Sequence, residues 1–319
     1  MRACKLVIGL LAAATLPAAA QQYPDRPIRL VVPYAPGGGT DLTSRLIALR
    51  LTESFKQQVI VDNRAGGASN IGAEITARSA PDGYTIMMAG ISFSINVSIF
   101  SKLGYDPIKD FDPVSLVATV PLIVVVHPSV PATNIKELIA LARAKPGTLN
   151  YASGGAGTAN HIAGELFKYM TGTDIVHVPY KGGGPALADV VGGQVQLLFN
   201  TMTSTVGFMN SGKLRALAVT GKRRSPGVPN LPTVAEAGVP GYDVGAWFGI
   251  VVPRGTQRAI VNKLNSEIVR ITRLPEAREQ FAAQGAEAIG STPEEFAQHL
   301  RVEIDKWAKV AKAAKMRAE

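Results

Sequence analysis

A glycine-rich segment, Pro33 to Asp41, is the part of this sequence whose residue types say most about chemistry. It reads Pro-Tyr-Ala-Pro-Gly-Gly-Gly-Thr-Asp and lies between an expected strand and the start of an expected helix. Glycines have no Cβ atom, so backbone N–H groups can approach a ligand, and the unpaired amides of a helix start carry partial positive charge. The segment therefore predicts an anion-binding turn, in which valine at Gly38 or Gly39 would block the amides and strain φ. A plain turn between a strand and a helix is the alternative.

Two later segments, residues 152–161 and 180–185, again place glycines between an expected strand and an expected helix. Ligands of open α/β sheets bind beyond the carboxyl ends of the strands, where such turns lie. Turns from two domains can therefore face each other across a cleft. The first segment matches neither the P-loop pattern nor the G-x-G-x-x-G pattern with its acidic residue, so a nucleotide is not favoured as the ligand.

The inventory of catalytic groups is poor. The four histidines lack zinc-site spacing, and no G-x-S-x-G nucleophile elbow occurs. His161 stands in the first turn of an expected helix, where it can donate to a bound anion or be satisfied by the backbone. Asp41 can cap its helix, and such a cap can also fix the loop that holds the ligand. The sequence thus predicts no catalytic residue, no metal and no cofactor.

Strands and helices alternate along the chain, which is typical of an α/β protein. The expected strands are residues 28–34, 59–63, 85–89, 122–127, 149–152, 175–178, 196–200, 214–220 and 248–252. The expected helices are residues 41–55, 70–78, 134–144, 158–170, 185–191, 256–272 and 293–315. Three blocks of this pattern predict a discontinuous arrangement, with residues 21–120 and 244–319 in domain 1 and residues 121–243 in domain 2. Two sequential domains would give a similar pattern.

The N-terminus has the pattern of a secretory signal. Arg2 and Lys5 precede an apolar run and three small residues that end at Ala20, so residues 1–20 are expected to be cleaved. An uncleaved anchor is the alternative, but the apolar run is shorter than the roughly 20 residues that span a bilayer. The single cysteine, Cys4, lies in this leader, so the exported chain is expected to contain no disulfide.

The charge of the chain does not indicate a nucleic-acid partner. Its 33 Lys and Arg outnumber its 24 Asp and Glu, but they are scattered, and aromatic residues make up only 6%. Nucleic-acid binding requires a concentrated basic face or aromatic platforms for stacking. The basic balance is instead compatible with small anionic ligands.

A series of short motifs follows in order along the expected mature chain. They are Tyr23 to Ile28, Val32 to Asp41, Asn63 to Ala68, Pro81 to Thr85, Ser153 to His161, Val178 to Gly182, Gly192 to Val195, Gly212 to Thr220 and Val234 to Gly238. In this order they resemble the Bug family of periplasmic solute-binding proteins, the receptors of tripartite tricarboxylate transporters. The chain departs from the family at Asn96-Val97, where members commonly have Asn-Pro, so a different shape is expected for residues 91–97.

The resemblance implies a type II periplasmic-binding fold, or Venus flytrap, in which two α/β domains joined by a two-crossing hinge close on a small carboxylate. It also implies that backbone amides of two facing loops hold one carboxylate. The implied positions are Tyr34, Ala35, Gly38, Gly39, Thr40 and Asp41 on one side, and Ser153, Gly157, Thr158 and His161 on the other.

Two more segments, residues 91–96 and 200–205, are expected to be loops that face the rest of the ligand, with Ser92 and Asn200 as contacts. Neither contains an acid or a base, so a ligand ammonium would be buried there without a partner. Phe93 and Met202 are expected to pack against an apolar or aromatic body. The expected ligand is a non-amino organic acid, either a dicarboxylate or an aromatic carboxylate.

These expectations favour a monomeric periplasmic receptor that hands a carboxylate to the transmembrane subunits of a tripartite tricarboxylate-type transporter. Domain closure, rather than chemistry, would be its functional event. Two alternatives stay open: an exported α/β enzyme that acts on such an acid, and a receptor that reports its ligand to a signalling partner. An enzyme would turn the acid over, whereas a receptor would leave it unchanged.

Overall fold

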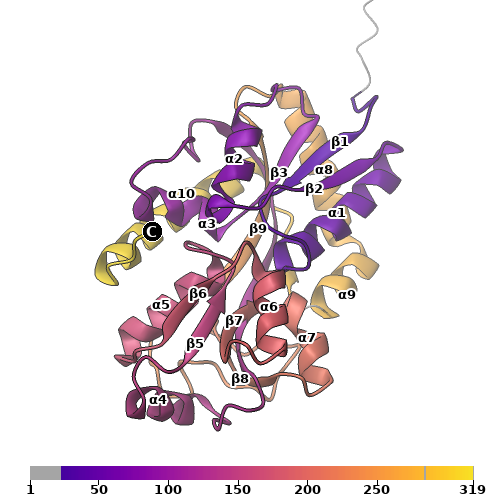
Figure 1. Ribbon diagram of the computed structural model, residues 1–319. Helices are drawn as coiled ribbons and strands as arrows, with labels where there is room; N and C mark the ends of the chain where they lie inside the picture. Colours follow the sequence, from indigo (N-terminus) through magenta and orange to yellow (C-terminus); the bar gives the residue numbers. More distant parts are fainter. Residues whose placement is uncertain (1–22, 284, 319) are drawn as a thin grey trace, which may run out of the picture.

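The computed structural model describes residues 23–283 and 285–318 (Figure 1). The predicted signal peptide, residues 1–20, lies outside the described residues. None of the helices in these two ranges combines the length and the apolar character needed to cross a membrane.

One continuous sheet runs through the described chain, and its two parts share the long strand β4 (Phe111–Val126). The first part has the order β2-β1-β3-β9-β4 and contains β1 (Ile28–Val32), β2 (Val59–Asn63), β3 (Thr85–Gly90), β9 (Gly245–Pro253) and the short β10 (Glu287–Ala288) beside β4. The second part has the order β4-β7-β5-β6 and contains β5 (Asn150–Ser153), β6 (Val176–Pro179), β7 (Leu197–Thr201) and β8 (Arg215–Val219). We call the first part with its helices lobe 1 and the second part with its helices lobe 2.

The helices of lobe 1 come from both ends of the chain, as the indigo and yellow segments of Figure 1 show. They are α1 (Gly39–Phe55), the 3₁₀ helix η1 (Gly67–Ser69), α2 (Asn70–Ala77), α3 (Ile91–Ile99), α8 (Arg258–Arg273), α9 (Pro275–Ala283) and α10 (Pro293–Ala313). The helices of lobe 2 are α4 (Ile135–Ala144), α5 (Ala159–Thr171), α6 (Gly183–Val191) and α7 (Met202–Asn210).

The parallel strands determine where helices begin. β1 pairs in parallel with β2 and β3, and β5 pairs in parallel with β6 and β7. Apolar runs such as Ile-Arg-Leu-Val-Val in β1 suit strands that are covered on both faces. A helix follows the carboxyl end of β1, β3, β5, β6 and β7 within a few residues. Helix starts from both lobes are thus brought to the boundary between the lobes.

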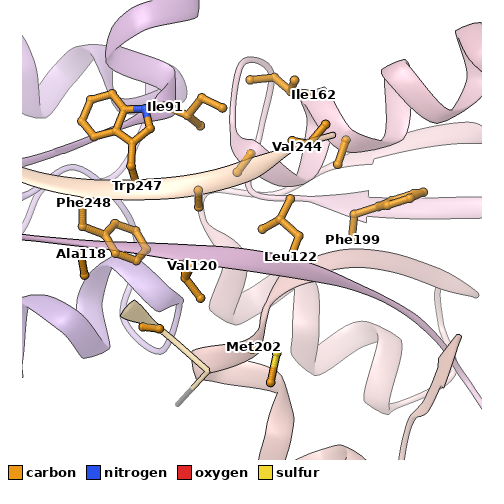
Figure 2. Packing of buried hydrophobic residues seen from close by; sticks show 14 of the residues in the cluster. Ile91, Ala118, Val120, Leu122, Ile162, Phe199, Met202, Val244, Trp247 and Phe248 are labelled. Carbon is orange, nitrogen blue, oxygen red and sulfur yellow. The ribbon is translucent and has the colours of Figure 1, made fainter. Parts of the chain in front are cut away.

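The chain crosses between the lobes on β4 and just before β9. β4 pairs antiparallel with β9 from Phe111 to Pro121, and then with β7 and β8 from Leu122 to Val126. Figure 2 shows buried side chains of both crossing segments side by side, among them Leu122 and Val244. The exact domain boundaries stay a prediction.

The sequence interpretation missed several elements. Residues 111–121 were not predicted as a strand, because prolines at 113 and 121 interrupt the run and two register shifts break its alternation. The segments 91–96 and 200–205 were expected to be loops, but they form the start of α3 and the end of β7 with the start of α7. Since α3 is buried on almost every side, it lacks the polar stripe by which a surface helix is recognised.

A buried carboxylate joins the last helix to β9. Glu303 on α10 accepts hydrogen bonds from the indole N–H of Trp247 at 3.2 Å and from the indole N–H of Trp307 at 2.8 Å. The ring of Trp247 also packs edge-on against Phe296 and His299. These contacts fix the Trp247 ring where β9 passes between the lobes.

We expect Glu303→Ala to destabilise the protein by about 3 kcal/mol, because it leaves two buried indole donors without an acceptor. Glu303→Gln keeps one acceptor oxygen and should lose less than half as much. Urea unfolding followed by circular dichroism measures both, with the exposed neighbour Asp305→Ala as control. Equal losses for Asp305→Ala and Glu303→Ala would contradict the role given to the carboxylate.

Candidate ligand-binding site

A small cavity lies where the lobes meet, and five of the described helices begin at its wall. The wall contains the N-terminal residues of α1 (Gly38, Gly39), α3 (Gly90, Ile91), α5 (Thr158, Ala159), α6 (Gly183) and α7 (Thr201). The cavity measures about 40 Å³, which is room for a few water molecules. Entry of a larger ligand therefore requires the lobes to separate.

Among the described residues, the wall combines apolar and polar groups and contains no charged side chain. Its side chains are the rings of Tyr34, Trp247 and Phe248, the aliphatic Ile91, Ala159 and Ala246, and the hydroxyl and amide groups of Thr40, Thr158, Asn160, Asn200 and Thr201. The amides of Gly38, Gly39 and Thr40 make no hydrogen bond to another described group. An anion here would be met by amide dipoles rather than by a cation.

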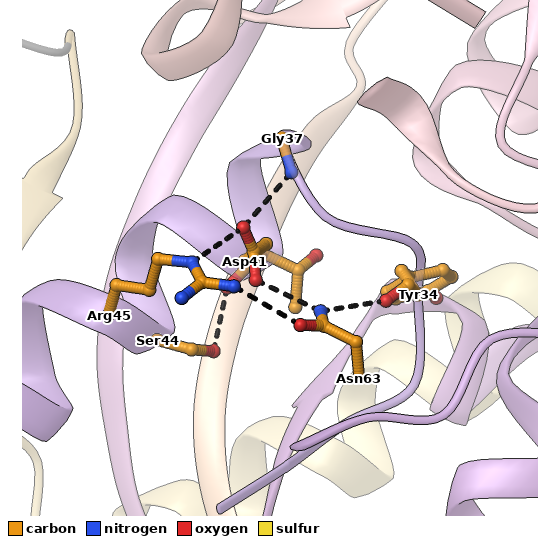
Figure 3. A network of polar contacts seen from close by, with 7 residues as sticks. Tyr34, Gly37, Asp41, Ser44, Arg45 and Asn63 are labelled. Atoms are coloured by element: carbon orange, nitrogen blue, oxygen red, sulfur yellow. Dashed lines mark hydrogen bonds and ion pairs between the residues drawn. The ribbon is translucent and has the colours of Figure 1, made fainter. Parts of the chain in front are cut away.

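Asp41 holds the first glycine loop from behind (Figure 3). Its carboxylate accepts hydrogen bonds from the Gly37 amide at 3.0 Å, from Arg45 Nε at 2.9 Å and from Asn63 Nδ2 at 2.9 Å. Asn63 Nδ2 also donates to the Tyr34 carbonyl at 2.9 Å. The expectation that Asp41 caps its helix is wrong, because α1 begins at Gly39 and its N-cap is Gly38. Asp41 instead lies in the first turn and clamps residues 34–41, and Arg45 balances its charge away from the cavity.

The charge on Asp41 is stabilised by these donors. Burial alone would raise the pKa of the carboxyl, but the hydrogen bonds from Arg45, Gly37 and Asn63 outweigh burial and hold the pKa below its ordinary value. Asp41 is thus ionised at neutral pH. Its negative charge does not oppose an anion in the cavity, because the guanidinium of Arg45 is paired with it.

The second glycine loop is held by its own helix start. The Thr158 side chain accepts a hydrogen bond from the His161 amide, and its hydroxyl donates to the Gly155 carbonyl at 2.7 Å. The Gly157 amide donates to His161 Nδ1 at 3.1 Å. On the neighbouring strand, Asn200 accepts from Asn160 Nδ2 at 2.9 Å. These bonds keep the loop and the amide side chains in fixed positions at the wall.

The two lobes touch directly through their loops. The Ala35 amide donates to the Lys181 carbonyl at 3.1 Å, and Ser92 Oγ donates to the Gly157 carbonyl at 2.9 Å. Gly39 lies against Thr201 so closely that a Cβ atom there would be 2.3 Å from Thr201 Oγ1. The arrangement is therefore closed.

The residues expected at the site fall into two groups. Tyr34, Gly38, Gly39, Thr40, Thr158 and Asn200 line the cavity. Ala35, Asp41, Ser92, Ser153, Gly157 and His161 are not part of the wall and hold the loops or join the lobes. The expectation that Phe93 and Met202 face the ligand is wrong. Phe93 stacks on Tyr105 at 5.6 Å, and Met202 lies against Gly285.

Ten of the sixteen lining residues were not among the site residues expected from the sequence, although Ile91 and Thr201 lie in the segments 91–96 and 200–205 that were expected to face the ligand. Gly183 lies in the third glycine run, whose pattern already indicated a strand-to-helix turn. Thr201 occupies the N-cap position of α7 without a capping hydrogen bond from its side chain, and the sequence signal for it was the end of an apolar strand. Trp247 and Phe248 are both buried and part of the wall. Among the residues with described positions, no group of three His, Cys, Asp or Glu side chains could hold a metal ion.

Comparison with known proteins places this site in a family. Residues 43–316 match the family model described as tripartite tricarboxylate transporter family receptor, TctC. The protein belongs to this receptor family. Protein BugT of Bordetella pertussis is 38% identical over 96% of this chain and 95% of BugT. The resemblance to the Bug family is thus confirmed.

Solved structures of similar receptors have the same fold. Rpa4515 of R. palustris, solved with adipate, has a TM-score of 0.91 and 39% identity and covers 93% of this chain and 100% of that chain. MatC of Rhodopseudomonas palustris, solved with bound malate, has a TM-score of 0.87 and 33% identity and covers 90% and 99%. The predicted two-domain periplasmic-binding fold is confirmed.

We expect Gly39→Ala to weaken binding of organic acids at least tenfold, because the new methyl group collides with Thr201 only when the lobes are closed. The free energy of unfolding should stay within about 1 kcal/mol of the wild-type value, since alanine is favourable in a helix. Calorimetry with adipate and malate measures the loss. Gly207→Ala, which adds a methyl group in open space on α7, is the control. Wild-type affinity in Gly39→Ala would show that the lobes do not close this far on the acid.

The expectation that valine at Gly38 would strain the backbone is wrong. Gly38 has φ of −83°, which any residue adopts, so strain does not contribute there. The left-handed conformation belongs to Gly37, whose φ is +87°.

We expect Asp41→Asn to destabilise the protein by about 2 kcal/mol, because it removes hydrogen bonds to a buried charge. The difference from wild type should be constant between pH 5 and 7 and shrink below pH about 4, because the unfolded chain then takes up a proton while the folded carboxylate, whose pKa is lower, is still ionised. Thermal unfolding across this pH range measures it. Glu53→Gln, which breaks an exposed pair on the same helix, should cost less than about 0.5 kcal/mol. A difference that persists unchanged at pH 3 would contradict the clamp.

Proposed function

We propose that the protein is a periplasmic receptor that captures a small organic acid between its lobes and delivers it to the transmembrane subunits of a tripartite tricarboxylate-type transporter. The family of the chain and the signal-like N-terminus support export to the periplasm. Within this proposal the receptor acts as a monomer, and it captures its ligand without catalysis.

The observation that carries the proposal is the convergence of helix starts on an uncharged cavity. Helices α1, α3, α5, α6 and α7 all begin at this wall, and the first amides of a helix have no acceptor within the helix. A carboxylate group can accept several such amide hydrogen bonds, and each helix start contributes partial positive charge. A neutral or cationic ligand would gain nothing from this arrangement.

The residues assigned to the carboxylate follow from this geometry. The amides of Gly38, Gly39 and Thr40 are free on lobe 1, and the start of α5 at Thr158 faces them from lobe 2. The Asn200 side chain is a further polar group at the wall. We assign Asp41 and His161 to the support of these loops.

The uncharged wall also restricts the rest of the ligand. An ammonium group would be buried without a carboxylate partner, so an amino acid is disfavoured. Trp247 and Phe248 offer aromatic surface to an apolar body. A dicarboxylate or an aromatic carboxylate fits these conditions, and similar receptors have been solved with adipate and malate.

Capture requires the lobes to move. The cavity of about 40 Å³ has room for only a few water molecules, and the described chain passes between the lobes twice, near Val120 and Val244. We therefore propose residues 21–120 with 244–319 and residues 121–243 as two domains that open and close about these crossings.

We expect a dicarboxylate at about 100-fold its Kd to raise Tm by about 5–10 °C. The panel is adipate, malate, succinate, aspartate and benzoate, measured by thermal shift and then by calorimetry. Succinate should bind more tightly than its amino analogue aspartate. The acid should be recovered unchanged after incubation, which separates a receptor from an enzyme.

Two results would overturn the proposal. If no acid of the panel stabilises the protein, a small carboxylate is not its ligand. If the acid is converted during incubation, the protein is an enzyme rather than a receptor. Delivery is tested separately by uptake of the bound acid into cells with and without the gene. Uptake that does not depend on the gene would leave a signalling receptor as the better description.

A further inference from the structure

A pair of buried histidines supports the second glycine loop from below. His161 on α5 and His177 on β6 have ring centroids 4.5 Å apart, and His161 is only 5% exposed. His161 Nδ1 accepts the hydrogen bond of the Gly157 amide, and His177 Nε2 lies 2.6 Å from Ser153 Oγ. Ser153 Oγ in turn accepts the Gly155 amide at 3.0 Å. Both ends of the loop therefore depend on imidazole groups.

The bond to Gly157 defines the proton state of His161. A ring nitrogen that accepts an N–H carries no proton, so His161 must be neutral, with its proton on Nε2. A protonated ring would turn an N–H toward the N–H of Gly157. Protonation therefore removes this bond and replaces it with repulsion.

Gly157 also forms a hydrogen bond with lobe 1. Its carbonyl accepts the hydroxyl of Ser92 at 2.9 Å, and Ser92 Oγ accepts the hydroxyl of Tyr34 at 2.6 Å. Gly157 has φ of +75° and lies so close to α3 that a Cβ atom would be 2.3 Å from Asn96 Oδ1. There is little room for Gly157 to shift, so its N–H bond in lobe 2 and its C=O bond across the cleft depend on each other.

The groups around the histidine pair favour the neutral rings. Burial lowers the pKa of His161, and burial together with the neighbouring His161 lowers the pKa of His177 to about 4. On α5, Lys168 acts in the same direction and Glu165 opposes it. Glu165 is itself paired with Lys168 at 3.1 Å and accepts the hydroxyl of Tyr151 on β5 at 2.6 Å.

We propose that His161 is a positioning residue whose neutral ring holds Gly157 for the bond to Ser92, so that its protonation weakens lobe closure and acidic pH weakens ligand binding. The binding part rests on the proposed function, whereas the state of the ring can be measured on its own. This gives His161 a role in positioning rather than in contact with the ligand.

The state of the ring is tested by NMR of protein labelled with ¹⁵N-histidine, without any added acid. The chain has four histidines, so few signals need assignment, and His161→Asn identifies one of them. We expect the His161 ring to be neutral at pH 7, with its proton on Nε2 and a pKa below 6.5. A proton on Nδ1, or a pKa at or above 6.5, would overturn the proposal.

The consequence for binding is tested with the panel acid that stabilises the protein most, by calorimetry at pH 7.5 and 5.5. Wild-type Kd should rise at the lower pH, by up to about tenfold, because a ring whose pKa lies below 6.5 is only partly protonated at pH 5.5. His161→Asn offers an amide oxygen to Gly157 that does not titrate, so it should stay within about threefold of wild type at pH 7.5 and lose most of the pH dependence.

The control is His127→Asn, which changes a histidine outside this cluster, beside Ser129. It should keep the full pH dependence. If His161→Asn keeps it as well, protonation of His161 is not the cause, and the proposal fails. If no acid of the panel binds, the proposed function fails, while the NMR result still decides the state of the ring.

Discussion

A negative charge that leaves water needs a compensating partner, and in this protein the compensation comes from the backbone. Burial of an isolated carboxylate is very costly, and the cavity wall of the described chain offers no cationic side chain. The partial charges of several helix starts can replace that cation, provided that the helices point at one place. Parallel strands meet this condition because their carboxyl ends lie at one edge of each lobe, and the next helix starts there.

The charged side chains near the cavity hold its loops in place and do not line its wall. Asp41 and Arg45 form a pair that fixes the first loop and satisfies its own charges, which leaves the amides of Gly38 to Thr40 free. Glu303 satisfies the indole N–H of Trp247, so the ring can form part of a polar cavity without needing a partner from the ligand. His161 fixes the second loop by accepting the hydrogen bond of the Gly157 amide. These supporting groups are thus satisfied within the protein, whereas the amides of Gly38, Gly39 and Thr40 at the cavity are not.

Much of this could be read from the sequence, because it depends on local patterns. The glycine runs and the alternation of strands and helices appear as short-range signals, and the first loop lies where they indicated. The motifs that resemble the Bug family added the prediction that two domains close on the ligand and that two loops face each other across it. The prediction was weaker where burial hides periodicity, as in α3, or where prolines and register shifts interrupt a strand, as in the first half of β4. The supporting roles of Ser92 and His161 depend on contacts between lobes and on ring orientation, for which sequence spacing gives no signal.

The most direct test of this account is to observe the backbone amides as an acid binds. Two-dimensional amide NMR of ¹⁵N-labelled protein, titrated with the dicarboxylate that binds most tightly, follows each N–H separately. The account predicts that the largest downfield shifts occur at Gly38, Gly39, Thr40 and Ala159, at helix starts from both lobes. Shifts confined to one lobe, or centred on exposed lysines and arginines away from the cavity, would contradict recognition by converging helix starts.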